Sequence, residues 1–188
     1  PAHAIELLST TNFVVEAGER QEEELWLATE GAVRIEGSAA DDLLILSGRF
    51  ELQGTAEGDL WLISGQAVVG GDAQQQVRVM AQSLVVTGRV GRSLAAAAGT
   101  IQITSNTVVG GDALLAADTV TVHGSIEGDL RLMANRVTLQ GHVSGDARLV
   151  ADDIVLLPGT TIEGDLVYTS REDLVPGKGV TIGGDLEP

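Results

Sequence analysis

A repeat of 17 residues constrains the fold of this chain more than any other feature of its sequence. Two consecutive copies, residues 112–128 and 129–145, align without a gap, and Asp146 opens a third copy. In this alignment the apolar positions coincide, so that Val120 matches Val137. Self-similarity at a short, fixed period is typical of repeat architectures, in which each copy packs mainly against its neighbours.

Apolar and polar residues alternate within each copy, which is the period of a β-strand rather than of a helix. Breaks at 135–136, Gly141 and 145–146 divide a copy into three short strands, and three strands with three corners make one rung of a solenoid. Connections between parallel strands are right-handed by default. We therefore predict an all-β fold, a right-handed parallel β-helix with three strands per rung, rungs of about 17 residues and roughly nine rungs. The predicted core residues of the second copy are Leu130, Leu132, Ala134, Val137, Leu139 and Val143.

The register predicts one continuous domain. We expect residues 1–24 to form an N-terminal lead-in and cap with a partial first rung, and 25–188 to form the solenoid. Counting 17 residues onward from Asp59 makes Gln76 and then Ser93 the openings of the next two rungs, so Asp72 is out of phase.

Two pairs of extra residues interrupt the period, near Ser105-Asn106 and near Pro158-Gly159. We expect both at corners, where a loop can grow without moving a strand.

The composition suits a narrow solenoid and excludes several classes of function. Aromatic residues make up only 3% of the chain and glycines number 24, as expected for stacked aliphatic side chains between tight corners. There is no cysteine, so disulfides and thiolate zinc sites are excluded. The formal net charge of −16 argues against nucleic acid and anionic membrane surfaces as direct partners. No apolar run approaches the length of about 18 residues that a membrane-spanning helix needs.

The repeated corners resemble those of the bactofilins, over about residues 25–186. The corners that carry the resemblance are Gly128-Asp129-Leu130, Gly145-Asp146-Ala147 and Gly164-Asp165-Leu166. The resemblance implies a right-handed, three-faced β-helix with a polymer-forming, scaffold-like role in bacteria. The nearest competing fold is the left-handed hexapeptide solenoid of some acyltransferases and γ-class carbonic anhydrases. Its coil is a multiple of six residues, and a period of 17 is not.

The segment 166–170, followed by Pro176-Gly177, is similar to a narrower group of bactofilin-like proteins. In that group a signal peptide precedes the solenoid and membrane-spanning helices follow it. The resemblance therefore implies a place outside the cytoplasm, in the periplasm or at the cell surface, with membrane anchoring by segments outside this chain. A chain that begins with Pro1 is expected to be cut from a longer one, and a cytoplasmic place is the alternative.

The sequence presents no evident catalytic, metal or cofactor site. His123 and His142 are expected on neighbouring rungs but in different columns, and His3 is remote in sequence. Zinc needs three or four converging ligands, which these residues do not supply. No phosphate-binding glycine loop or nucleophile elbow occurs. We therefore expect no enzyme, no cofactor and no metal.

A column of aspartates at one corner has two interpretations. Stacked carboxylates repel one another unless something compensates. We expect each to accept hydrogen bonds from backbone amides of its own corner, as aspartate does in turns. The sharper alternative is a ladder that binds calcium between rungs. The column comprises Asp42, Asp59, Asp112, Asp129, Asp146, Asp165 and Asp185, and Gln76 and Ser93 interrupt it.

The first strand of each rung is apolar on its outward side as well as its inward side. Soluble monomers rarely expose so long an apolar patch, so either this chain or a partner covers it. Residues 1–23 could shield only its start, and we therefore expect a second copy or another protein to cover it. Arg78, Arg131 and Arg148 lie at its margin, where they can meet an acidic partner surface. The candidate interface residues are Trp26, Leu44, Leu46, Trp61, Ile63, Met80, Leu114, Met133 and Val150.

These observations predict a non-enzymatic structural or scaffold module of a bacterial envelope or cytoskeletal assembly, which self-associates or binds a protein partner through this face. The alternative is a carbohydrate- or cell-wall-binding or adhesion module that uses exposed Trp26 and Trp61 as stacking platforms. An enzyme of the hexapeptide-solenoid type is the third hypothesis.

Overall fold

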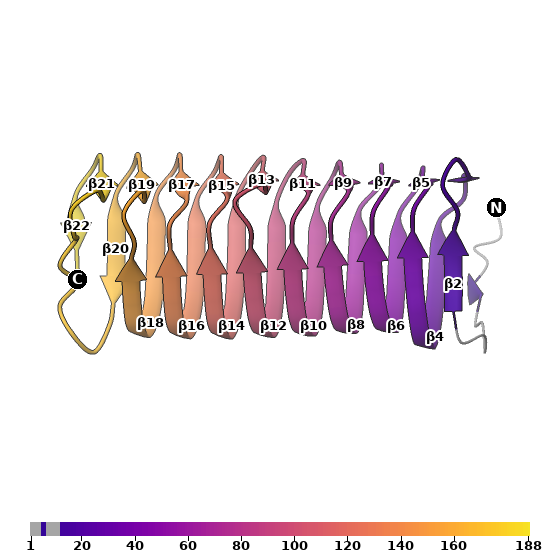
Figure 1. Cartoon of the computed structure of the whole chain (residues 1–188), viewed down its shortest axis with the longest axis horizontal. Coiled ribbons are helices and arrows are strands. Elements are labelled where there is room, and N and C mark those ends of the chain that lie inside the picture. The colour runs from indigo at the N-terminus through magenta and orange to yellow at the C-terminus, as the bar shows by residue number, and fades with distance from the viewer. Residues whose placement is uncertain (1–4, 7–11) are drawn as a thin grey trace.

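The chain forms a parallel β-solenoid (Figure 1). The structure is a computed structural model, and it describes residues 5–6 and 12–188. About ten turns of about 17 residues stack along one axis, with β2 and β22 at opposite ends of the rod. Neighbouring rungs pair in the predicted register, since Val77 lies beside Leu60 and Val79 beside Leu62. The predicted fold class is confirmed.

Each full rung contributes one long and one short strand, and these form two parallel sheets. The 12-stranded sheet contains β1 (Ile5–Glu6), β2 (Asn12–Val15), β4 (Leu25–Ile35), β6 (Leu43–Leu52), β8 (Leu60–Val69), β10 (Val77–Val86), β12 (Leu94–Ile103), β14 (Ala113–Val122), β16 (Leu130–Leu139), β18 (Ala147–Leu156), β20 (Leu166–Thr169) and β22 (Leu186–Glu187). The 10-stranded sheet contains β3 (Arg20–Gln21), β5 (Ser38–Ala39), β7 (Thr55–Ala56), β9 (Asp72–Ala73), β11 (Arg89–Val90), β13 (Val108–Val109), β15 (Ser125–Ile126), β17 (His142–Val143), β19 (Thr161–Ile162) and β21 (Thr181–Ile182). In the described part of the chain no helix is long and apolar enough to cross a membrane.

The predicted break at 135–136 is a corner inside one continuous strand. Ala134 pairs with Ala117 and Arg136 pairs with Thr119, so only Asn135 leaves the ladder between β14 and β16. Asn135 and Arg136 are both exposed, which shifts the alternation of inward and outward side chains. At this corner the chain turns from one side of the solenoid to the next, and the ladder loses only one residue pair.

The core consists of columns of aliphatic side chains that stack from rung to rung. Among the predicted core residues of β16 and β17, all except Ala134 are buried, and Ala134 is partly buried against the same cluster. Phe50 is the largest fully buried side chain. Because parallel ladders satisfy the backbone amides and carbonyls, a core this narrow can remain almost entirely apolar.

Asp72 lies in β9, in the short-strand sheet, where it pairs with Thr55 and Arg89. The prediction that it is out of phase with the aspartate column is therefore confirmed.

Both predicted insertions lie at corners, and a buried threonine closes each one. The Thr107 hydroxyl donates to the carbonyl oxygen of Val86 at 2.6 Å, and the Thr160 hydroxyl donates to that of Leu139 at 2.7 Å. Each hydroxyl reaches a carbonyl of the preceding rung, so an enlarged corner stays attached to the rod.

Residues 12–24 form the partial rung that the sequence predicts at this end. β2 pairs with β4 and β3 pairs with β5. Arg20 extends across the rungs, and its Nη2 donates to Glu57 Oε2 at 2.9 Å. This bond lowers the pKa of Glu57 and raises that of Arg20. The rest of the predicted lead-in, residues 1–4 and 7–11, lies outside the described residues.

Candidate functional site

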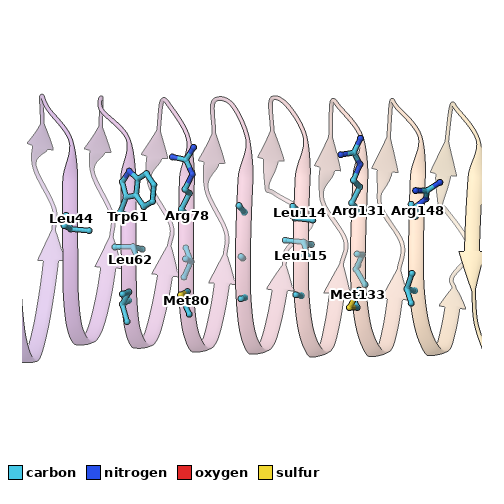
Figure 2. A pocket seen from close by; sticks show the side chains of 18 residues that line it. Leu44, Trp61, Leu62, Arg78, Met80, Leu114, Leu115, Arg131, Met133 and Arg148 are labelled. Atoms are coloured by element: carbon cyan, nitrogen blue, oxygen red, sulfur yellow. The ribbon is translucent and has the colours of Figure 1, made fainter.

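The outward side chains in the first half of strands β6 to β18 are mostly apolar. Two outward positions in each rung contribute, so two columns run along the rod (Figure 2). Met80 and Met133 are the most exposed, at 60% and 63%, far above what a covered side chain shows. We call this surface the apolar face, and its large exposed members are Leu44, Leu46, Trp61, Ile63, Met80, Leu114, Met133 and Val150.

The apolar face is hollowed near its middle because small residues lie there. On β12, Ala95 pairs with Arg78 and Ala97 pairs with Met80 of the preceding strand. On the other side Ala95 pairs with Leu114 of β14. Ala95 therefore lies between larger neighbours, and in the other column Ala97 and Ala116 lie together between Met80 and Met133. The groove along this face has a volume of about 660 Å³.

Arg78 lies flat against Trp61. Its guanidinium carbon is 4.3 Å from the centre of the ring, within the range of a cation–π contact. Arg78 Nη2 donates to Gln76 Oε1 at 2.5 Å, and Nη1 lies 3.6 Å from Asp59 Oδ2. These contacts hold the guanidinium in place and cover one side of the indole. The sequence placed Arg78 at the margin of the face without indicating this stacking.

Trp26 differs from the other candidate interface residues. It is partly buried, and its Nε1–H donates to Glu24 Oε1 at 2.6 Å. β1 also runs beside β4 here, with Ile5 paired to Trp26. The repeat could not predict this neighbour, because β1 does not follow the 17-residue pattern. The expectation that both tryptophans are exposed holds for Trp61, which is 45% exposed, and not for Trp26.

The aspartates of the corner column accept backbone hydrogen bonds, but from the next rung rather than from their own. The N–H of Asp129 donates to Asp112 Oδ1 at 2.9 Å, and that of Asp146 donates to Asp129 Oδ1 at 3.1 Å. The same bond joins Asp165 to Asp146 at 2.9 Å and Asp185 to Asp165 at 2.8 Å. The expected donor, an amide of the same corner, is therefore wrong. Each of these carboxylates extends along the rod and reaches the backbone amide of the next rung.

This geometry explains why glycine precedes the aspartate. A Cβ on Gly145 would lie 2.4 Å from Asp129 Oδ1, and one on Gly164 would lie 2.2 Å from Asp146 Oδ1. Real Cβ atoms do not approach an oxygen so closely. The aspartate of one rung can therefore take this position only if the next rung has a glycine beside it. Where Gln75 replaces the glycine, the bond from Gln76 N–H to Asp59 Oδ1 lengthens to 3.3 Å.

The described residues contain no group of three histidine, aspartate or glutamate side chains arranged to hold a metal ion. His142 Nε2 lies 3.1 Å from Ser144 Oγ and 3.2 Å from Glu163 Oε1 on the surface. His123 is partly buried and follows β14, at a different corner. His3 lies outside the described residues.

The chemistry available on the apolar face is that of binding. Its exposed groups are aliphatic, thioether, indole and guanidinium groups, which make apolar, stacking and charged contacts. Comparisons of the chain with protein-family models, curated protein sequences and solved structures find no match. The resemblance to the bactofilins therefore rests on the sequence pattern alone and stays a prediction.

Proposed function

We propose that the protein is a non-enzymatic structural module that associates through its apolar face. The observation that carries this proposal is the continuity of that face. One of its two columns runs from Leu46 on β6 to Val150 on β18 without a polar residue, and arginines interrupt only the other column. Continuous exposed apolar patches of this kind mark interaction sites in soluble proteins.

The energetics of covering the face are sufficient for association. Fully burying a large aliphatic side chain stabilises by about 1.5–3 kcal/mol, so eight side chains that are about half exposed contribute about 6–12 kcal/mol. Association costs about 4–15 kcal/mol in lost freedom of motion. The free energy gained by burying this one face is thus similar to the free energy lost on association. A partner that buries apolar surface of its own adds to the gain and makes binding favourable.

The rigidity of the solenoid suits a scaffold. The binding side chains lie on paired strands, so little chain entropy is lost when the face is covered. The formal charge of −16 keeps the remaining surface solvated and disfavours non-specific contact between the polar faces. A place outside the cytoplasm is part of this proposal, and its support is the resemblance of the segment 166–170.

The structure gives less support to a glycan-binding module. Stacking on a sugar requires an open aromatic ring, but Arg78 covers one side of Trp61 and Trp26 is partly buried. Leucine, isoleucine and methionine, which surround Trp61, suit protein contact better than sugar hydroxyls.

The test is the double substitution Ile63→Glu with Met80→Glu. Both residues point outward, so the core columns are unchanged. The parent should sediment above its monomer mass, and the variant should sediment as a monomer with unchanged β-sheet circular dichroism. The matched control, Gln66→Glu with Gln102→Glu, adds the same charge at exposed positions outside the face and should leave association intact. A monomeric parent, or a double variant that associates like the parent, overturns the proposal.

A further inference from the structure

The two ends of the apolar face differ in chemical character. Near the N-terminal end, the column beside the aspartates carries Leu44 and Trp61, next to Asp42 and Asp59. Near the C-terminal end, the same column carries Arg131 and Arg148 (Figure 2). The aspartate column runs beside both ends, and Arg131 Nη2 lies 3.7 Å from Asp129 Oδ2. One end therefore has carboxylates beside apolar side chains, and the other has carboxylates beside arginines.

The middle of the face has matching relief. β10 presents Met80, which projects, and Arg78, whose guanidinium lies against Trp61; β12 presents Ala95 and Ala97, which do not project. A surface with a ridge next to a furrow of the same direction and length can fit a rotated copy of itself. The rotation axis must then lie between the ridge and the furrow.

From these two features we infer that the occupant of the apolar face is a second copy of this chain, packed face to face with its rod axis reversed. The two-fold axis lies between β10 and β12 and runs along the strands, so β10 of each copy lies over β12 of the other. This inference rests on the proposed function and names its partner and its geometry.

The remaining rungs also match in this arrangement. β8 lies over β14, so Trp61 meets Leu114 and Ile63 meets Ala116. Such an isologous interface repeats every contact twice, once from each copy.

Each end of the interface brings carboxylates of the two copies together with an arginine. β6 lies over β16, which places Asp42 opposite Asp129 of the second copy and brings Arg131 onto Leu44, beside both carboxylates. β4 lies over β18, which brings Arg148 onto Trp26 in the rung that Glu24 opens. No arginine of the face lies opposite another arginine. Arg131 and Arg148 thus offset the repulsion between the facing aspartate columns, and the matching relief in the middle of the face specifies the antiparallel orientation.

A side-by-side pair with parallel rods fits less well. An axis along the rod would place every rung opposite itself, so Ala95 would face Ala97 and the two grooves would coincide as an empty space. In the same pair Trp61 would meet Ile63, which holds the sheets apart. Packing contacts are lost across such voids.

The size of the interface is adequate for a specific dimer. Eight strands at about 4.8 Å spacing and about five residues at 3.3 Å give a footprint of about 38 Å by 16 Å, or about 600 Å² per copy. Specific interfaces bury about 800 Å² per partner, and stable ones occur down to about this footprint. The strands keep one orientation along the rod (Figure 1), so the match extends over the whole length.

The test uses the absence of cysteine from the chain. Ile63→Cys and Ala116→Cys are made in separate chains with tags of different mass, mixed, and oxidised. The antiparallel pair brings the two positions together, whereas two copies of either variant alone hold their cysteines about three rungs apart, about 14 Å along the rod. Disulfides do not form between Cα atoms much more than about 7 Å apart, so the mixed dimer should exceed either homodimer about tenfold or more.

The comparison mixture is Leu114→Cys with Ala116→Cys, whose positions meet only if the rods are parallel. A preferred covalent dimer in this second mixture overturns the antiparallel geometry but leaves association through the face intact. A dimer that Ile63→Glu with Met80→Glu disrupts, but that neither mixture cross-links, also overturns the geometry alone. A monomeric parent overturns both the pairing and the proposed function.

Discussion

Substitution of Asp129 tests how the aspartate column joins one rung to the next. Its Oδ1 accepts the N–H of Asp146 at 3.1 Å, and its own N–H donates to Asp112 at 2.9 Å. Asp129→Ala removes the acceptor and the charge together. Asp129→Asn keeps an acceptor oxygen and removes only the charge, so the two variants separate the hydrogen bond from the repulsion.

The magnitudes follow from the spacing of the column. Carboxylates about 4.8 Å apart repel by about 0.9 kcal/mol each in water without salt, so two neighbours contribute about 1.7 kcal/mol. Attraction to Arg131 Nη2, 3.7 Å from Asp129 Oδ2, offsets about 1.1 kcal/mol of this repulsion. A hydrogen bond to a charged acceptor contributes about 1.5–3 kcal/mol and one to a neutral acceptor about 0.5–1.5 kcal/mol. Asp129→Asn should therefore lie within about 1 kcal/mol of the parent. Asp129→Ala should be about 1 kcal/mol less stable than the asparagine variant, because it leaves the Asp146 amide without its acceptor.

The assay is denaturant unfolding of all three proteins at low and at high salt. Because salt screens the repulsion and not the hydrogen bond, the asparagine variant should gain on the parent at low salt. An alanine variant as stable as the asparagine variant would refute the hydrogen-bond account. A rise of many degrees in the parent's melting temperature on adding calcium, reversed by chelator, would favour the ion ladder instead.

Three further predictions concern the corners and the core. Gly145→Ala should destabilise the protein markedly, because the new Cβ would lie 2.4 Å from Asp129 Oδ1. Asp129→Ala should rescue this variant only in part, because the Cβ would also lie 2.8 Å from the Gly128 carbonyl oxygen. A double-mutant cycle in thermal unfolding measures the coupling between the two positions, and strictly additive effects would contradict the prediction. Thr160→Val should lower the free energy of chemical unfolding by about 1–3 kcal/mol, because it removes the hydroxyl that donates to the Leu139 carbonyl oxygen. The control Thr169→Val, at an exposed position, should change it little, and equal effects of the two substitutions would contradict the prediction. Leu139→Asp buries an unpaired charge in a fully buried position and should cost several kcal/mol by the same assay, and a variant that melts like the parent would show the register to be wrong.

Much of the fold follows from the sequence because a solenoid repeats its local rules. The 17-residue period placed Val77 beside Leu60 and excluded Asp72 from the aspartate column. It also located the two corners that contain extra residues. Apolar alternation identified the inward side chains because each strand has only two sides. The continuity of strand through Asn135 was not evident, because one unpaired residue leaves the same pattern as a break.

Features that depend on contact between rungs were harder to predict. The donor to Asp129 and the partners of Thr107 lie one rung away, at distances the pattern does not encode. The burial of Trp26 depends on β1, which is outside the repeat. The apolar face itself was predictable from the outward positions. Its central groove follows from the alanines once the strands are in register.

The central claim is that the apolar face is covered by association, and the two methionines of the chain report on it directly. Met80 and Met133 both lie on this face, at 60% and 63% exposure in the single chain. The measurement is their rate of oxidation by peroxide, followed by peptide mass spectrometry as protein concentration rises. The account predicts that both rates fall several-fold at high concentration and stay high when Ile63→Glu keeps the chains apart. Rates that stay the same at every concentration in both proteins would contradict it.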